Sequence, residues 1–113
     1  MKIYHNSRCR KSRDTLKILE EKNIKCEIIN YLDSPPSTKE IELILKKLKI
    51  QPIDLVRKNE KIWKEKYKGI ILTNKKIINI LIKNPKLIER PIVINGTKAI
   101  IGRPPENVYD LFD

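Results

Sequence analysis

The spacing of apolar side chains along the first thirty residues changes from that of a strand to that of a helix and back. Residues 2–5 are consistent with a short strand, residues 12–22 place their apolar side chains at helical intervals, and residues 24–30 alternate with period two. The alternation places three apolar side chains on one face of the second strand: Ile24, Cys26 and Ile28. A strand, a helix and a strand within thirty residues predict a βαβ unit with parallel strands.

The middle of the chain has helical spacing. The pattern predicts stretches of helix over about residues 37–48, 52–59, 61–67 and 73–84. Ser37 followed by Glu40 is a capping box for the first of these helices. Thr73 caps the last one, which ends before Pro85. We therefore expect an all-helical insertion over about residues 37–84.

Strand signals return near residue 91. The apolar segment of residues 91–94 is typical of a buried strand, Asn95-Gly96 is a strong signal for a two-residue hairpin loop, and residues 97–101 supply the partner strand. The two strands are therefore expected to be antiparallel. Pro104-Pro105-Glu106 then opens a terminal helix.

These elements predict an α/β fold with the order β-α-β, helical insertion, β-β-α. The chain would form a single domain over residues 1–113, in which a mixed four-stranded sheet carries helices on its faces. This order is that of the thioredoxin-like plan. In that plan a reactive cysteine follows the first strand, and a cis proline opens the third strand beside it; Pro91 is the candidate.

The composition is strongly basic, with a formal net charge of +11 and with Lys outnumbering Arg 19 to 6. A charge of this size raises nucleic acid as a partner. The lysines are, however, scattered along helix faces and interleaved with Glu, which is typical of a solvated surface. No RNA-binding or zinc-finger signature accompanies them, so we expect no nucleic-acid partner.

The lengths of the apolar runs and the number of cysteines indicate in which cellular compartment the protein is expected. No apolar run approaches the roughly 20 residues of a membrane span, and no apolar segment typical of a signal peptide follows the basic N-terminus. With two cysteines and one histidine, neither a disulfide scaffold nor a zinc site is expected. We expect a cytoplasmic monomer without a membrane partner.

Cys9 is the residue best placed for chemistry, because the predicted elements put it between the first strand and the first helix. A helix N-terminus offers unpaired backbone N–H groups and the positive end of the macrodipole, and both stabilise a thiolate. His5 lies four residues upstream, and four cations are close in sequence: Arg8, Arg10, Lys11 and Arg13. Such surroundings can lower the pKa of a thiol to between roughly 3.5 and 7.5.

Ser12 occupies the place of the second cysteine in a C-x-x-C motif. A C-x-x-S loop keeps a hydrogen-bond donor for the thiolate but cannot close a local disulfide, so disulfide chemistry needs a second molecule or a distant cysteine. The alternative is that Cys9 is an inert, half-buried small residue. For Cys26, the apolar strand face favours a core position over a resolving thiol.

Three motifs carry a resemblance to a known family. The loop H-N-x-x-C-x-x-S-R is met by His5, Asn6, Cys9, Ser12 and Arg13. Three further arginines stand in Leu-Val-Arg-Lys-Asn, Glu-Arg-Pro and Gly-Arg-Pro, at Arg57, Arg90 and Arg103. In these motifs, and over essentially its whole length, the chain resembles the glutaredoxin-coupled arsenate reductases. Arsenate is an anion near neutral pH, and several fork-shaped donors suit it.

The resemblance implies an arsenate reductase that serves in arsenical resistance. The Cys9 thiolate would attack arsenate, with His5 and Ser12 supporting the thiolate. The residues that bind the oxyanion would be Arg57, Arg90, Arg103 and Asn6, with Pro91 as a structural neighbour. Glutathione would be the reductant and glutaredoxin the partner, and no bound cofactor or metal is required.

Several alternatives remain open at this point. His5 is either a structural histidine under the loop or a group that tunes the thiolate, and the three arginines are either an oxyanion site or separate surface residues. The protein could also be a redox regulator of the Spx type that binds RNA polymerase, although Ser12 replaces the second cysteine of that switch. A third possibility is a glutathione-dependent thiol oxidoreductase with a substrate other than arsenate.

Overall fold

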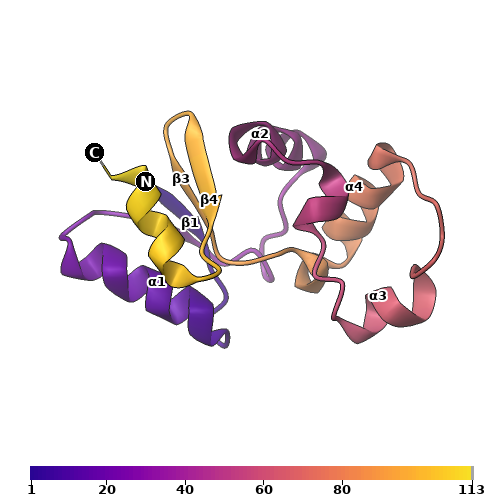
Figure 1. Cartoon of the computed structure of the whole chain (residues 1–113), viewed down its shortest axis with the longest axis horizontal. Coiled ribbons are helices and arrows are strands. Elements are labelled where there is room, and N and C mark those ends of the chain that lie inside the picture. The colour runs from indigo at the N-terminus through magenta and orange to yellow at the C-terminus, as the bar shows by residue number, and fades with distance from the viewer. Residues whose placement is uncertain (113) are drawn as a thin grey trace. The chain divides into compact units, whose positions relative to one another are not determined.

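The computed structural model describes residues 1–112, and these fall into two compact units (Figure 1). The first unit joins residues 1–34 to the segment that begins at Arg90, and the second unit is Pro35–Glu89. The helical insertion expected from the sequence lies in the second unit, and the four-stranded sheet lies in the first.

The first unit is a mixed sheet with helices packed on it. Its strands are β1 (Lys2–Tyr4), β2 (Glu27–Ile29), β3 (Ile92–Asn95) and β4 (Lys98–Ile101), and its helices are α1 (Arg10–Glu21) and the 3₁₀ helix η3 (Pro105–Leu111). The strand order is β2-β1-β3-β4, with β1 parallel to β2 and with β3 antiparallel to both of its neighbours. The predicted mixed four-stranded α/β fold, arranged on the thioredoxin-like plan, is confirmed.

The core of this unit lies between one face of the sheet and the two helices α1 and η3, which lie side by side in Figure 1. Ile3 and Val93 are opposite each other in the register of β1 and β3, and both are fully buried. They pack with Leu19 of α1 and with Val108 and Leu111 of η3. Each such side chain contributes roughly 1.5 to 3 kcal/mol through burial, so this cluster fixes both helices against the sheet.

The second strand is shorter than the sequence predicts, and the predicted face is wrong for one residue. β2 begins only at Glu27, and Ile28 is 52% exposed. Ile24 and Cys26 precede the strand and pack, half-buried, against the core. The alternation fails because the chain between α1 and β2 is not part of the strand, and because β2 is an edge strand with one neighbour.

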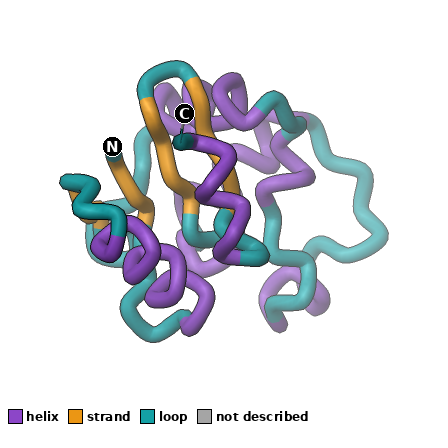
Figure 2. The backbone as a smooth tube through the Cα atoms, turned by 60° about the vertical axis from the view of Figure 1, so that its left-hand side comes forward, coloured by secondary structure: helices purple, strands orange, loops and turns teal. Residues whose placement is uncertain are grey.

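β3 and β4 form a hairpin (Figure 2). Its loop lies one residue later than predicted. Asn95 is still paired, with Lys98, so the two-residue loop is Gly96-Thr97. Gly96 has φ = +61°, and a type II′ turn needs glycine at this first loop position. As a strand residue, Asn95 donates a hydrogen bond from Nδ2 to the carbonyl of Leu111, at 3.0 Å. This bond ties the hairpin to the end of η3.

The second unit is helical, as predicted, and contains α2 (Thr38–Leu48), η1 (Pro52–Leu55), α3 (Lys61–Lys66), α4 (Asn74–Lys83) and η2 (Pro85–Leu87). The capping box is present, because Ser37 Oγ accepts from the Glu40 N–H at 3.2 Å and Glu40 Oε1 accepts from the Ser37 N–H at 3.3 Å. Thr73 Oγ1 accepts from the Lys76 N–H at the start of α4. Local start signals therefore set these helix boundaries.

The stretch after Pro52 is a short 3₁₀ helix, whereas the sequence predicts helix to about residue 59. The chain becomes extended at Val56, which forms an isolated antiparallel bridge with Ile88. The backbone N–H of Arg57 then donates to the carbonyl of Leu87 at 2.7 Å. Pairing between distant parts of the unit thus overrides the local helical spacing.

Gly102 lies just after β4, where three segments of the first unit approach closely. Its N–H donates to the carbonyl of Pro91 at 2.8 Å. A Cβ atom at this position would lie 2.5 Å from Thr15 Oγ1 and 2.8 Å from Pro91 Cγ. Only glycine fits this approach without a shift of α1 or of Pro91.

We expect Gly102→Ala to lower the free energy of unfolding by about 1–3 kcal/mol, because the added methyl group overpacks the contact. Thr15→Ala removes the nearer obstacle, so the double variant should be less destabilised than the sum of the two single variants. Urea unfolding followed by circular dichroism measures both effects. Strictly additive losses would contradict the proposed overlap.

Candidate active site

Cys9 lies at the junction between β1 and α1, where the sequence analysis places it. It is the N-cap residue of α1, and its carbonyl accepts from the Arg13 N–H at 3.0 Å. Asn6 folds the preceding loop, since its carbonyl accepts from the Cys9 N–H at 3.0 Å and its Oδ1 accepts from the Arg8 N–H at 3.0 Å. Arg13 Nη1 donates to the carbonyl of Ser7 at 2.9 Å. The loop is thus held in shape by its own residues.

Ser12 and His5 form a hydrogen-bonded pair beneath this loop. Ser12 is fully buried, its Oγ accepts from the Asn6 N–H at 3.1 Å, and the same oxygen lies 2.6 Å from His5 Nδ1. Burial, and then the charge of Arg13, lower the pKa of His5, which favours a neutral imidazole. A neutral ring either accepts from or donates to the Ser12 hydroxyl at Nδ1, depending on its tautomer. This contact agrees with a structural histidine under the loop, and a role of His5 in tuning the thiolate stays a prediction.

Ser12 supports the Cys9 thiolate differently from the sequence expectation. The hydroxyl was the expected donor, but it is engaged by Asn6 and His5. The part of Ser12 that helps to lower the pKa of Cys9 is its backbone N–H. This is the free N–H of a helix first turn, so any residue other than proline at position 12 would supply it.

Two arginines from the other end of the chain reach the Cys9 sulfur. Arg103 Nη2 donates to Cys9 Sγ at 3.4 Å, and Arg103 Nε donates to the carbonyl of Arg90 at 2.8 Å. The Arg90 side chain is buried and also hydrogen-bonds to the sulfur. Burial raises the pKa of Cys9, but the Ser12 N–H, the Arg90 hydrogen bond and the charges of Arg103 and Arg90 outweigh it. The pKa of Cys9 is therefore lowered, which favours the thiolate.

The positive charge that lowers the pKa of Cys9 does not come from the cations next to it in sequence, as the sequence analysis expects, but from Arg90 and Arg103. The groups that lower the pKa of Cys9 are Ser12, Arg90 and Arg103, and not the cations adjacent in sequence. Arg10, for example, has a side chain that is 86% exposed and pairs with Asp14 at 3.9 Å. Exposed charges are screened by solvent, so closeness in sequence does not make them effective.

Arg57 belongs to the second unit, where two carboxylates hold its side chain. Its Nη1 lies 3.4 Å from Glu60 Oε1, and its Nε lies 3.6 Å from Glu89 Oε1. The side chain is 22% exposed. Its assignment to an oxyanion site, like that of Asn6, stays a prediction from the family resemblance.

Cys26, the second free cysteine, is poorly suited to reactivity. Burial is the main influence on it and raises the pKa of its thiol; the N-terminal charge lowers the pKa, and Glu27 raises it further. A higher pKa leaves less thiolate at neutral pH. The position at the edge of the core agrees with the structural role favoured from the sequence.

Pro91, expected as a cis proline beside the site, follows a cis peptide bond after Arg90. A second cis bond joins Arg103 to Pro104. Both arginines that contact Cys9 are therefore followed directly by a proline, and the Pro91 carbonyl accepts from the Gly102 N–H at 2.8 Å. These contacts bring the two arginine segments together.

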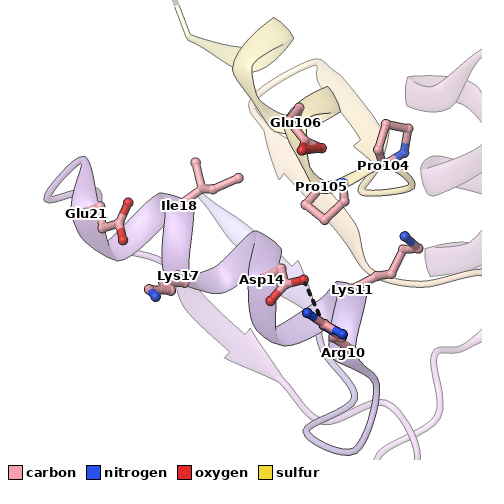
Figure 3. A pocket seen from close by; sticks show the side chains of 9 residues that line it. All are labelled: Arg10, Lys11, Asp14, Lys17, Ile18, Glu21, Pro104, Pro105 and Glu106. Atoms are coloured by element: carbon pink, nitrogen blue, oxygen red, sulfur yellow. Dashed lines mark ion pairs between the residues drawn. The ribbon is translucent and has the colours of Figure 1, made fainter.

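A groove of about 590 Å³ runs between α1 and the start of η3 (Figure 3). Its α1 wall carries Lys11, Asp14 and Lys17, and the opposite wall carries Pro105 and Glu106. Both signs of charge line it, so it suits a zwitterionic ligand better than a simple anion.

Within residues 1–112, no three His, Cys, Asp or Glu side chains are grouped so that they could hold a metal ion. None of the helices in this part of the chain has the length and the apolar character needed to span a membrane.

Comparison with known proteins decides the family. The model of the ArsC family matches residues 4–111. The chain belongs to the ArsC family. An arsenate reductase of Haemophilus influenzae is 45% identical to it over 114 residues, covering 96% of each chain. The uncharacterized protein YfgD of Escherichia coli K12 is 41% identical, covering 98% of this chain and 95% of YfgD.

Solved structures agree with this membership in the ArsC family. An arsenate reductase from Vibrio cholerae superimposes with a TM-score of 0.93 at 37% identity, covering 99% of this chain and 98% of the other. A putative arsenate reductase from Yersinia pestis gives a TM-score of 0.90 at 41% identity, with 96% and 97% covered. The family resemblance drawn from the three motifs is confirmed.

The source of the charge at Cys9 can be tested by alkylation with iodoacetamide in a Cys26→Ser background. The rate follows the thiolate fraction, so it rises with pH to a plateau, with a midpoint at the pKa of Cys9. We expect this midpoint to lie below that of an ordinary free thiol. Arg103→Gln should shift the midpoint upward, so that the variant reacts more slowly at any pH below both midpoints.

Arg10→Gln is the matched control, because it removes a guanidinium that is adjacent in sequence but exposed. It should leave the midpoint unchanged. A shift as large as that of Arg103→Gln would restore the view that the neighbouring cations activate Cys9.

Proposed function

We propose that the protein is a thiol-dependent arsenate reductase, with Cys9 as the nucleophile and with glutathione and glutaredoxin as the source of electrons. The observation that carries this proposal is the hydrogen bond from Arg103 Nη2 to Cys9 Sγ, with Arg90 at the same sulfur. A nucleophile beside two guanidinium groups can attack an anion that it would otherwise repel. Relatives named arsenate reductase, at 39% and 45% identity, support the choice of substrate.

The reaction begins when the Cys9 thiolate attacks the arsenic atom of arsenate. A sulfur–arsenic bond forms, and an oxygen leaves as water after protonation. A glutathione thiolate then attacks the Cys9 sulfur, and the electron pair of the broken sulfur–arsenic bond passes to arsenic. As(V) becomes As(III) and leaves as arsenite, while Cys9 and glutathione are oxidised to a mixed disulfide. Glutaredoxin takes over the glutathionyl group and releases the Cys9 thiolate.

Arg90 and Arg103 would hold the arsenate oxygens in this scheme. Guanidinium groups bind oxyanions through paired N–H donors, and they stabilise charge that builds up on oxygen during attack. Arg57 would be a third donor, by the family resemblance. Phosphate has the same shape and charge, but thiols do not readily reduce it, so it should act only as an inhibitor.

The groove beside α1 supports a small zwitterionic thiol as the reductant. Glutathione carries one ammonium and two carboxylate groups, and the groove presents Lys11 and Lys17 together with Asp14 and Glu106. Its two walls begin next to Cys9 and Arg103 in the sequence. No prosthetic group is required, because glutathione supplies the electrons from solution.

The test is oxidation of NADPH on addition of arsenate, with glutathione, glutaredoxin and glutathione reductase present. We expect turnover by the wild type and none by Cys9→Ser. Arg103→Ala should lower kcat/KM by roughly 10²- to 10³-fold, as the loss of one donor to a developing oxyanion does elsewhere. Turnover that survives Cys9→Ser would rule out the proposed nucleophile.

The reductant can be tested by replacing glutathione and glutaredoxin with thioredoxin and its reductase. We expect turnover to be lost, because Ser12 cannot resolve an oxidised Cys9 and the half-buried Cys26 is not activated. Cys26→Ser should accordingly keep wild-type turnover in the glutathione assay. Equal activity with thioredoxin would contradict glutathione coupling. No turnover with any reductant, together with co-purification of RNA polymerase, would favour the Spx-type regulator.

A further inference from the structure

Arg103 lies in an irregular connection between β4 and η3, so no strand or helix fixes its backbone. Its side chain nevertheless has to meet two targets on other segments, the carbonyl of Arg90 and the sulfur of Cys9. A side chain with four rotatable bonds holds such a position only when its backbone is fixed. The residues that fix the backbone of Arg103 therefore determine the charge at Cys9.

Asn107, in the first turn of η3, makes two hydrogen bonds to this connection. Its Nδ2 donates to the carbonyl of Ile101 at 3.1 Å and to the carbonyl of Arg103 at 3.2 Å. An amide nitrogen carries two N–H groups, so one side chain can serve both acceptors. The Ile101 carbonyl also accepts from the Arg103 N–H at 2.8 Å. Asn107 is thus hydrogen-bonded to the carbonyl of Arg103 and to the carbonyl that accepts from the Arg103 N–H.

Asn107 is itself well anchored. Its backbone N–H donates to the carbonyl of Pro104 at 3.0 Å, and the next residue, Val108, is fully buried in the core cluster. Gly102, the residue before Arg103, lies so close to Thr15 and Pro91 that an added Cβ atom would overlap with both. The connection is therefore held by its contacts with α1 and Pro91, and Asn107 is the side chain that joins it to η3.

We infer that Asn107 is a positioning residue for the Arg103 guanidinium, and that it acts on the reactivity of Cys9 through Arg103. Its described hydrogen bonds go to backbone carbonyls and not to the sulfur. Loss of its amide frees the backbone of Arg103, so the guanidinium spends less time at Cys9 and the thiolate loses stabilisation. The inference deepens the proposed function, but its main readout is the thiol itself and does not depend on arsenate.

The experiment compares Asn107→Ala with Asn95→Ala, both in the Cys26→Ser background. Asn95 is the matched control, because its Nδ2 also donates to a backbone carbonyl of the same unit, that of Leu111 at 3.0 Å, away from Arg103. Both variants should lose some stability. Asn107→Ala should shift the midpoint of Cys9 alkylation by iodoacetamide upward, toward that of Arg103→Ala. Asn95→Ala should leave the midpoint unchanged.

A double variant separates positioning from a general loosening of the fold. If Asn107 acts through Arg103, then Asn107→Ala should cause no further shift once Arg103→Ala is present. An additive shift, or an unchanged midpoint in Asn107→Ala, would overturn the inference. If Asn107→Ala is too unstable to measure, Asn107→Ser keeps one hydroxyl donor and should give a smaller upward shift; no shift there would overturn it equally.

Turnover supplies a second readout that separates this inference from the proposed function. In the coupled assay we expect Asn107→Ala to lower kcat/KM for arsenate by up to about 10²-fold, the cost of a catalytic group misplaced by about 1 Å. A wild type without arsenate turnover would refute the proposed function, while the alkylation midpoints would still decide the role of Asn107.

Discussion

The hydrogen bond between the Arg103 guanidinium and the Cys9 sulfur is the contact on which the candidate site depends. It joins residues 94 positions apart and brings the end of β4 to the start of α1. Burial alone would raise the pKa of Cys9 and leave an inert thiol. The Ser12 N–H, together with Arg90 and Arg103 at the sulfur, reverses that effect and lowers the pKa. Placing two like charges together costs free energy, which an anion between them offsets, so the same arrangement favours both a thiolate and an oxyanion.

Arg57 differs from Arg103 in the groups that its guanidinium already contacts. Its guanidinium pairs with the carboxylates of Glu60 and Glu89, whereas the Nε of Arg103 donates to a neutral carbonyl. An oxyanion at Arg57 would therefore compete with two carboxylates for the guanidinium. At the Nε of Arg103 it would compete only with a neutral carbonyl. Arg57 and Arg103, which look equivalent in sequence, are thus held by different partners.

Much of the fold follows from local signals. The capping box at Ser37, the cap at Thr73 and the strand–helix–strand spacing of the first thirty residues each specify an element through neighbours only a few positions away. The predicted helix after Pro52 fails because a distant partner decides: Val56 leaves the helical spacing to pair with Ile88. The hairpin differs for a local reason, because the additional pair between Asn95 and Lys98 moves the loop by one residue.

The candidate site likewise has some features that the sequence predicts and others that depend on the folded structure. The element order, the family and the place of Cys9 at a helix N-terminus could all be predicted from the amino-acid sequence, because each depends on contiguous residues or fixed spacings. Three features required the folded chain: which charges act on that sulfur, the support of the thiolate by the Ser12 backbone N–H, and the hydrogen bonds from Asn107 to the Arg103 connection. Electrostatic influence depends on distance and burial in space, and adjacency in the chain specifies neither.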